Sequence, residues 1–192
     1  GDGKREEARK ILSRIFLADP DGKRPESAEA HLEIGLMHRR LREYPPALES
    51  IARARKLALT LTGRAGAAGS ADAGRPDLLD RVLYELAFTQ ILAGARQDLI
   101  ATLEEYDAKA RSPDARRHAW VLLQLGTARR KAGAVQAARA AYSRCDQLYP
   151  RAAEARECRQ PVIAMLGGHV VKVGCSPLII DLAEKALKKA GY

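Results

Sequence analysis

A spacing of twelve residues recurs along this chain of 192 residues, inside runs of helical periodicity. Gly35 precedes Ala47 by twelve positions. Gly126 precedes Ala138 by the same interval, and Ala138 precedes Pro150 by twelve again. Small residues let two antiparallel helices approach closely, and a proline ends the second helix because it lacks an N–H and clashes with the preceding turn. The spacing therefore predicts antiparallel pairs of helices.

The best copy of this pattern surrounds Gly126. Its motif positions read Leu122-x-x-Leu125-Gly126-x-x-Arg129, then Ala138-x-x-x-Tyr142, then Pro150. The pattern resembles the tetratricopeptide repeat (TPR), a helix–turn–helix unit of about 34 residues. The chain departs from the family at Arg129, where an aromatic residue is expected. The resemblance implies an interaction module, because such units build binding surfaces and seldom active sites.

Two weaker copies of the pattern occur earlier in the chain. One surrounds Gly35 and contains His31, Ile34, His38, Ala47, Ile51 and Ala54, with Leu59 in place of the closing proline. The other surrounds Ala87 and contains Leu83, Leu86, Gln90, Leu99 and Leu103. Because Leu99 occupies a position where the motif has a small alanine, we expect this helix pair to be spread more widely.

The resemblance implies an all-α fold, a helical-hairpin (TPR-like) solenoid of about eight helices with a C-terminal capping helix. The array would cover residues 4–150, with a half repeat at 4–20 and repeats at about 28–60, 77–108 and 118–150. Residues 63–76 are rich in Gly, Ala and Ser without an apolar period, which predicts an inserted, mobile surface loop. The half repeat leaves two interpretations open: a piece of a longer protein, or a lone capping helix.

Residues 151–192 are predicted to form the C-terminal helical cap. The helical pattern from Ala152 to Leu166 contains Pro161, which should end or kink the helix. After a break at Gly167 and a short extended stretch over 169–173, Ser176 and the following proline predict the start of a last helix that stops at Gly191.

The formal net charge is +9, which raises the question of an acidic partner. Basic residues are nevertheless interspersed with Glu and Asp along every predicted helix, which favours an ordinary solvated surface. The densest basic groups lie at 39–42, 53–56 and 129–131. No apolar stretch is long enough for a transmembrane helix, and no signal peptide is visible.

Three cysteines, Cys145, Cys158 and Cys175, lack the spacing of a zinc site, so we expect no metal. Two interpretations of Cys145 stay open: a buried thiol at a position that favours small residues, or a disulfide with Cys158 across the turn at Pro150. The sequence leaves the compartment open between cytoplasm and periplasm, and a bridge would favour the periplasm, because disulfides persist in oxidising environments.

No catalytic residue or cofactor site emerges from the sequence. The chain lacks a phosphate-binding glycine loop and a nucleophile elbow, and its four histidines are scattered. A pairing of Cys175 with His169 would lack a third group to orient it. We expect no enzymatic activity and no cofactor.

In the TPR family the first helix of each unit lines a concave groove, and the resemblance implies the same here. The residues expected to face the groove, away from the glycine contacts, are Leu32, Leu36 and Arg39, then Tyr84, Phe88 and Ile91, then Trp120, Leu123, Thr127 and Arg130. Leu32 and Leu36 stand where relatives that clamp a terminal carboxylate carry polar residues. The groove is therefore expected to bind a partner helix or an apolar peptide, unless a helix of the same protein fills it.

Two functional classes remain. The first is a protein-interaction scaffold or adaptor, expected to be a subunit of a larger bacterial assembly; the Arg- and Ala-rich composition is typical of a GC-rich bacterial genome. The second is a binder of nucleic acid or another polyanion through the basic surface. Counterion release would make the second kind of binding fall steeply with salt.

Overall fold

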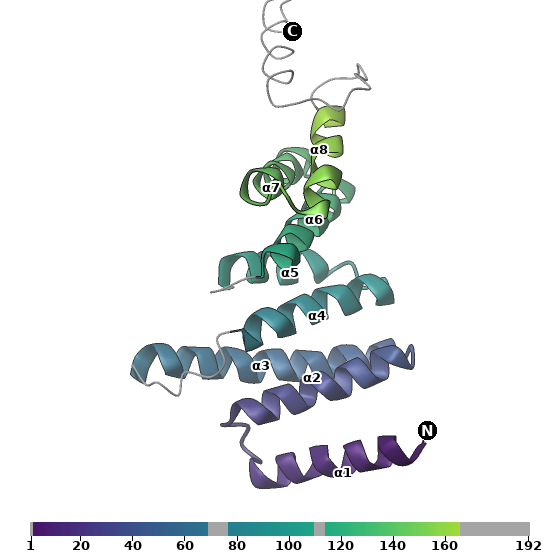
Figure 1. Ribbon diagram of the computed structural model, residues 1–192, viewed down its shortest axis with the longest axis vertical. Helices are drawn as coiled ribbons and strands as arrows, with labels where there is room; N and C mark the ends of the chain where they lie inside the picture. The colour runs from purple at the N-terminus through teal and green to yellow at the C-terminus, as the bar shows by residue number, and fades with distance from the viewer. Residues whose placement is uncertain (1, 69–76, 110–113, 166–192) are drawn as a thin grey trace, which may run out of the picture.

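The computed structural model describes residues 2–68, 77–109 and 114–165. These ranges contain eight α-helices and no strand, which confirms the all-helical prediction for this part of the chain (Figure 1). The helices are α1 (Asp2–Ala18), α2 (Pro25–Arg40), α3 (Tyr44–Ala68), α4 (Leu78–Ala93), α5 (Leu99–Lys109), α6 (Ala115–Lys131), α7 (Val135–Leu148) and α8 (Ala153–Met165).

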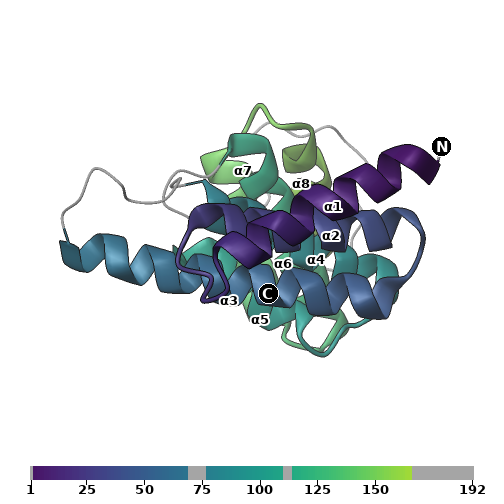
Figure 2. The same ribbon diagram turned by 90° about the horizontal axis from the view of Figure 1, so that it is seen from below.

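The helices pack sequentially along the long axis of the molecule, from α1 at one end to α8 at the other (Figure 1). Short turns join α2 to α3, α4 to α5 and α6 to α7, and each helix packs against its neighbours in the chain. In addition, α2 contacts α4, and α6 contacts α8. Seen from below, the C-terminal part of α3 projects away from the other helices (Figure 2).

Two glycines lie where paired helices are in close contact, as the twelve-residue spacing predicts. A Cβ atom at Gly35 would collide with the side chain of Ile51 and lie 3.0 Å from the carbonyl oxygen of Ala47, both on α3. A Cβ atom at Gly126 would lie 2.5 Å from the ring of Tyr142 on α7. Both glycines are buried. The prediction that Gly35 and Gly126 are contact points between paired helices is therefore confirmed.

Two buried clusters form the core. The larger extends through α2 to α7 and includes Leu32, Ile51, Leu83 and Leu103, each fully buried. The smaller joins α6, α7 and α8 around Tyr142. Their helices bury apolar residues at intervals of three and four, the spacing that places side chains on one helix face.

Ion pairs connect each hairpin to the next. Arg81 of α4 donates to Glu33 of α2 at 2.6 Å, and Arg55 of α3 donates to Glu105 of α5 at the same distance. Further along, Arg144 of α7 donates to Asp107 of α5. These pairs join residues that are neighbours in space but far apart in the chain, so they help to set the register between successive hairpins.

The turn between α1 and α2 is organised by the carboxylate of Asp19. It accepts hydrogen bonds from the backbone N–H groups of Lys23 and Arg24, both at 2.9 Å, and from the Ser27 hydroxyl at 2.5 Å. Phe16 of α1 then lies against His31 of α2, with ring centres 4.5 Å apart. The predicted helix before Pro20 is therefore present, and this turn directs it against α2.

One boundary prediction is wrong, and for another, that Pro161 ends or kinks its helix, the first alternative is excluded. The predicted loop at 63–76 begins too early, because α3 continues to Ala68. Its residues 65, 67 and 68 are alanines, which favour helix strongly enough to outweigh the neighbouring glycines. Likewise α8 continues past Pro161 to Met165, so the proline does not end the helix. A proline removes one backbone hydrogen bond, which the rest of a packed helix can tolerate.

The remaining parts of these predictions fall outside the described residues. They are the rest of the inserted loop, over 69–76, and the C-terminal cap after Met165, including the break at Gly167, the extended stretch, the last helix and Cys175. None of the described helices is long and apolar enough to cross a membrane.

Candidate partner-binding surface

Three residues predicted to face an open groove lie in the core. Leu32 and Leu36 of α2 are 0% and 7% exposed and belong to the larger buried cluster. Leu123 of α6, also 7% exposed, belongs to the smaller cluster. Because α3 and α4 both pack against α2, its apolar side chains are enclosed from two sides. These three leucines are not accessible to a partner in this structure.

Three other predicted residues come together at the surface. Tyr84 and Phe88 of α4 are separated by one helical turn and therefore lie on the same face. Their ring centres are 6.5 Å apart, and Trp120 of α6 lies 4.9 Å from Tyr84 and 6.0 Å from Phe88. All three side chains are half-buried. We call these three residues the aromatic surface.

The aromatic surface bridges α4 and α6. Tyr84 and Trp120 pack on the larger core cluster with part of their rings, whereas Phe88 belongs to neither buried cluster. Rings in tilted and edge-on arrangements at these distances attract one another by about 0.5–1.5 kcal/mol beyond their buried area. Phe88 therefore contributes less to the core than the other two rings.

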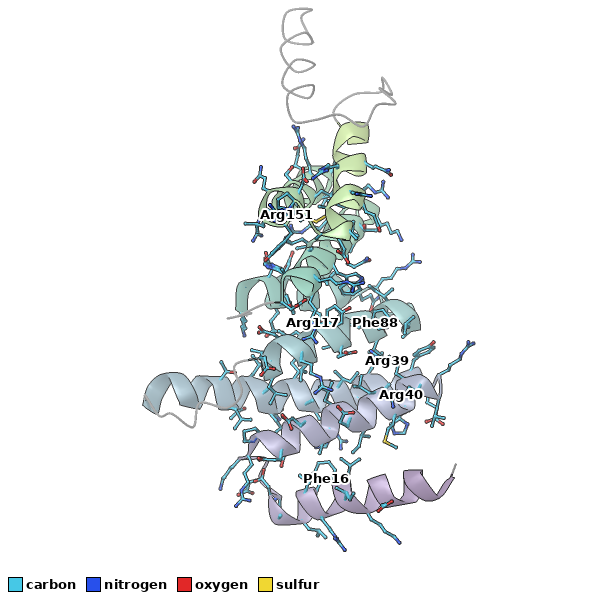
Figure 3. All side chains as sticks on the ribbon, viewed as in Figure 1. Phe16, Arg39, Arg40, Phe88, Arg117 and Arg151 are labelled. Carbon is cyan, nitrogen blue, oxygen red and sulfur yellow. A yellow bond between two sulfur atoms is a disulfide. The ribbon has the colours of Figure 1, made fainter. Side chains whose placement is uncertain are left out.

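Arg39 of α2 borders the aromatic surface and is fixed in position. Its guanidinium carbon lies 5.0 Å from the centre of the Phe88 ring, an arrangement typical of a cation–π contact. Nη1 of the same group donates to Glu85 at 2.6 Å and to the Thr89 hydroxyl at 3.2 Å. Figure 3 shows Arg39, Phe88 and Arg117 close together in the middle of the stack, with Arg151 nearer to α8.

Residues from the start of α6 complete the other border. The guanidinium of Arg117 lies 5.7 Å from the Tyr84 ring centre. A pocket of about 260 Å³ is lined by Tyr84, Arg116, Arg117, Trp120 and Glu154. We call it the Trp120 pocket. Burial raises the pKa of the Tyr84 hydroxyl, and the nearby carboxylates of Glu85 and Glu154 add to this shift while Arg117 and Arg116 oppose it, so the hydroxyl stays protonated at neutral pH.

Sequence reasoning missed Arg116, Arg117 and Glu154. The two arginines precede Trp120 by four and three residues, a helical spacing that could have identified them. Glu154 belongs to α8 and reaches the pocket only because α8 packs on α6. No local signal in the sequence indicates that position.

The other predicted groove residues lie elsewhere. Ile91 and Thr127 line a separate pocket of about 320 Å³ between α4, α5 and α6, and Arg130 is exposed on the last turn of α6. Thr127 also donates to the Leu123 carbonyl oxygen at 2.9 Å and lies 3.1 Å from the Tyr142 hydroxyl. The predicted groove is therefore divided between a core part, the aromatic surface and this second pocket.

A cluster of polar side chains surrounds His118 of α6, which is 7% exposed. One ring nitrogen lies 2.9 Å from Asp107 of α5, and the other lies 2.6 Å from the Tyr149 hydroxyl after α7. Burial tends to raise the pKa of Asp107, but hydrogen bonds from Arg144 and His118 outweigh it and lower the pKa. This cluster ties three helices together, and its polar atoms are occupied by one another.

Of the two interpretations of Cys145, the structure favours the bridge. Cys145 of α7 and Cys158 of α8 lie at disulfide distance, and both are fully buried. The pair connects the last hairpin to α8. Within the described ranges, no group of three or more His, Cys, Asp or Glu side chains is placed to hold a metal ion.

No protein-family model matches this chain, and no curated protein matches it significantly in sequence.

Proposed function

We propose that this protein is an interaction scaffold, a helical-hairpin array of TPR type that binds a peptide or helix of a partner protein. The observation that carries this proposal is the aromatic surface. Phe88 lies outside both core clusters, next to the rings of Tyr84 and Trp120 and beneath the guanidinium of Arg39. An aromatic group that contributes little to the core is well suited to an external contact.

The composition of this surface fits a binding site energetically. Burying an aromatic or leucine side chain contributes about 1.5–3 kcal/mol. Trp, Tyr and Arg are also the residue types that most often dominate binding energy at protein interfaces. Arg39 is held by Glu85 and Thr89 before any partner arrives, which lowers the entropic cost of using it.

The alternative, binding of nucleic acid through the basic surface, has weaker support. In each of the three basic groups at least one arginine is engaged by a carboxylate: Arg39 by Glu85, Arg55 by Glu105 and Arg129 by Glu104. The exposed cations of these groups are distributed over α2, α3 and α6. Their distribution favours a solvated surface over a single continuous nucleic-acid groove.

We further propose that the protein works in an oxidising compartment, such as the bacterial periplasm, as a subunit of a larger assembly. The proximity of Cys145 and Cys158 supports this, because such a bridge is rare in the reducing cytosol. The proposal assigns the chain no catalytic role and no cofactor.

Trp120 gives a direct test because it is the only tryptophan of the chain and belongs to the aromatic surface. A phage-displayed library of short random peptides is selected against the full chain, and Trp120 emission is followed as selected peptides are titrated. Phe88→Ala should weaken binding at least about tenfold, the scale of a hot-spot truncation. Ile91→Ala is the matched control, because Ile91 is on the same helix but lines the separate pocket between α4, α5 and α6.

Two outcomes would contradict the scaffold proposal. Selected peptides could bind without changing Trp120 emission and with equal affinity for Phe88→Ala. Alternatively, a duplex DNA probe could bind tightly, with affinity falling steeply as salt is added, which would favour the polyanion alternative.

A further inference from the structure

Two neighbouring pockets share a common wall at the α8 end of the aromatic surface. Arg116 and Glu154 line the Trp120 pocket of about 260 Å³ and also a neighbouring pocket of about 460 Å³, which we call the Tyr149 pocket. The rest of the lining of the Tyr149 pocket is Ala115, Leu148, Tyr149, Pro150, Arg151, Ala152 and Ala153. Arg116 and Glu154 therefore stand between two hollows of the same surface.

Each pocket offers apolar wall against which a side chain can pack. The Trp120 pocket has the aromatic rings of Tyr84 and Trp120 on its wall beside three charged side chains, whereas the Tyr149 pocket is walled mostly by apolar atoms that include Leu148, which is 52% exposed. The Trp120 pocket is smaller than the roughly 300–1,000 Å³ of typical small-molecule sites. A single inserted side chain suits its size better than a cofactor does.

The charges around the two pockets are unbalanced. Three guanidinium groups, of Arg116, Arg117 and Arg151, face a single carboxylate, that of Glu154. Arg116 is 86% exposed and only loosely paired, with its Nε 3.7 Å from Glu154. The structure gives the guanidinium groups of Arg117 and Arg151 no hydrogen bond to any other described residue. This surplus of positive charge favours a partner with carboxylates.

Glu154 adds a second requirement. Its Oε2 atom is buried and has no hydrogen-bond partner among the described residues. A buried acceptor without a donor costs free energy, which a donor from a ligand would recover. A backbone N–H of an extended peptide that crosses the wall between the pockets would supply such a donor once the Glu154 side chain turned this atom toward the surface.

We infer that these two pockets bind an extended segment of a partner protein in which acidic residues lie between two apolar side chains. One apolar side chain occupies each pocket, and the carboxylates pair with Arg116 and its neighbouring arginines on the wall between them. This inference rests on the proposed scaffold function and specifies the chemistry of the partner. A basic segment is disfavoured by the three guanidinium groups.

The test uses peptides from the same phage-displayed library, selected against the full chain. The inference predicts that they are enriched in Asp or Glu between two apolar residues. Fluorescence anisotropy then measures their affinity for the wild type, for Arg116→Glu, and for Arg156→Glu. Arg156 is an exposed arginine of α8 outside both pocket linings, so it provides the same charge change as a control.

Arg116→Glu should weaken binding about tenfold or more, and Arg156→Glu by less than about twofold, because only the first charge would contact the peptide. Arg116→Gln, which keeps the length of the side chain without placing a carboxylate beside Glu154, should give a smaller loss in the same direction. Circular dichroism melts of all three variants check that folding is intact.

Each result decides between the two proposals. Peptides that depend on Phe88 but lack acidic residues, or that ignore Arg116→Glu, overturn this inference and leave the scaffold function standing. A library that yields no binder dependent on either residue overturns both. If sedimentation shows that the free chain dimerises and that Arg116→Glu dissociates it, the occupant is a second copy and the inference is wrong.

Discussion

A Cβ atom at Gly126 of α6 would lie 2.5 Å from Cε1 of Tyr142, a fully buried residue of α7. The ring has no free space to move into, because it is part of the core cluster that joins α6, α7 and α8. We therefore expect Gly126→Ala to lower the free energy of unfolding by about 1–3 kcal/mol, the usual cost of overpacking. Urea denaturation would measure the change.

Gly63→Ala is the matched control for this substitution. Gly63 also lies inside a helix, α3, but it is exposed and a Cβ atom there would meet nothing within 4 Å. Alanine should therefore stabilise the chain by up to about 1 kcal/mol through its helix propensity. A stabilising effect of Gly126→Ala would show that the close contact with Tyr142 is misplaced.

Truncating Phe88 should affect binding more than folding. Phe88 lies outside the core clusters, whereas Leu86 of the same helix is 5% exposed and belongs to the larger one. Leu86→Ala should cost about 2–5 kcal/mol of stability. Phe88→Ala should cost clearly less, as thermal melts of both variants would show. Equal destabilisation would mean that Phe88 is a core residue and would remove the basis of the proposed binding site.

Asp19 should make the joint between α1 and α2 sensitive to acid. The hydrogen bond from Ser27 lowers the pKa of this carboxyl most, followed by the one from the Arg24 backbone. A carboxyl with a depressed pKa in the folded state contributes stability above its unfolded pKa of about 3.9, and this contribution is lost as the pH falls through the folded value. Stability should therefore rise with pH across this acidic range.

We expect Asp19→Asn to lower the melting temperature at pH 7 and the difference from wild type to shrink below about pH 4, as the wild-type carboxyl also becomes protonated. Asp21→Asn is the control, because Asp21 is exposed and, among the described residues, its carboxylate forms an ion pair with Lys23 alone. A difference between Asp19→Asn and wild type that stays constant with pH would contradict the role of the ionised carboxylate.

Reduction should weaken the attachment of α8. Cys145 and Cys158 are separated by 13 positions, and a bridge that closes a loop of this size typically contributes about 3 kcal/mol. Peptide mapping without reductant should recover the two cysteines in one linked fragment. Dithiothreitol should then lower the melting temperature of the wild type. It should have no effect on the double variant Cys145→Ala with Cys158→Ala, and a wild type equally insensitive to reductant would contradict the bridge.

The local architecture could be predicted from the sequence because it depends on short-range patterns. Helical periodicity and the small residues at Gly35 and Gly126 determine where helices form and where two of them approach closely. Helix ends were predicted less well. The alanines before Ala68 extend α3, and α8 continues past Pro161, because propensity and packing along a whole helix outweigh single residues that disfavour it.

The candidate site was predicted only in part. Tyr84, Phe88 and Trp120 do gather at the surface, but Leu32, Leu36 and Leu123 are enclosed by the core. The register of a single helix shows which side chains share a face. It does not show how many neighbouring helices cover that face.

The sequence by itself therefore determined the helical class, the main helices and the small-residue contacts within two hairpins, since these follow from backbone propensity and sterics over a few turns. Only the tertiary structure decided which apolar faces stay open, and it brought Glu154 of α8 beside Arg116 and Trp120 of α6. The physical reason is that exposure and charge pairing depend on the packing angles between helices. These angles are set by many weak contacts between residues far apart in the chain.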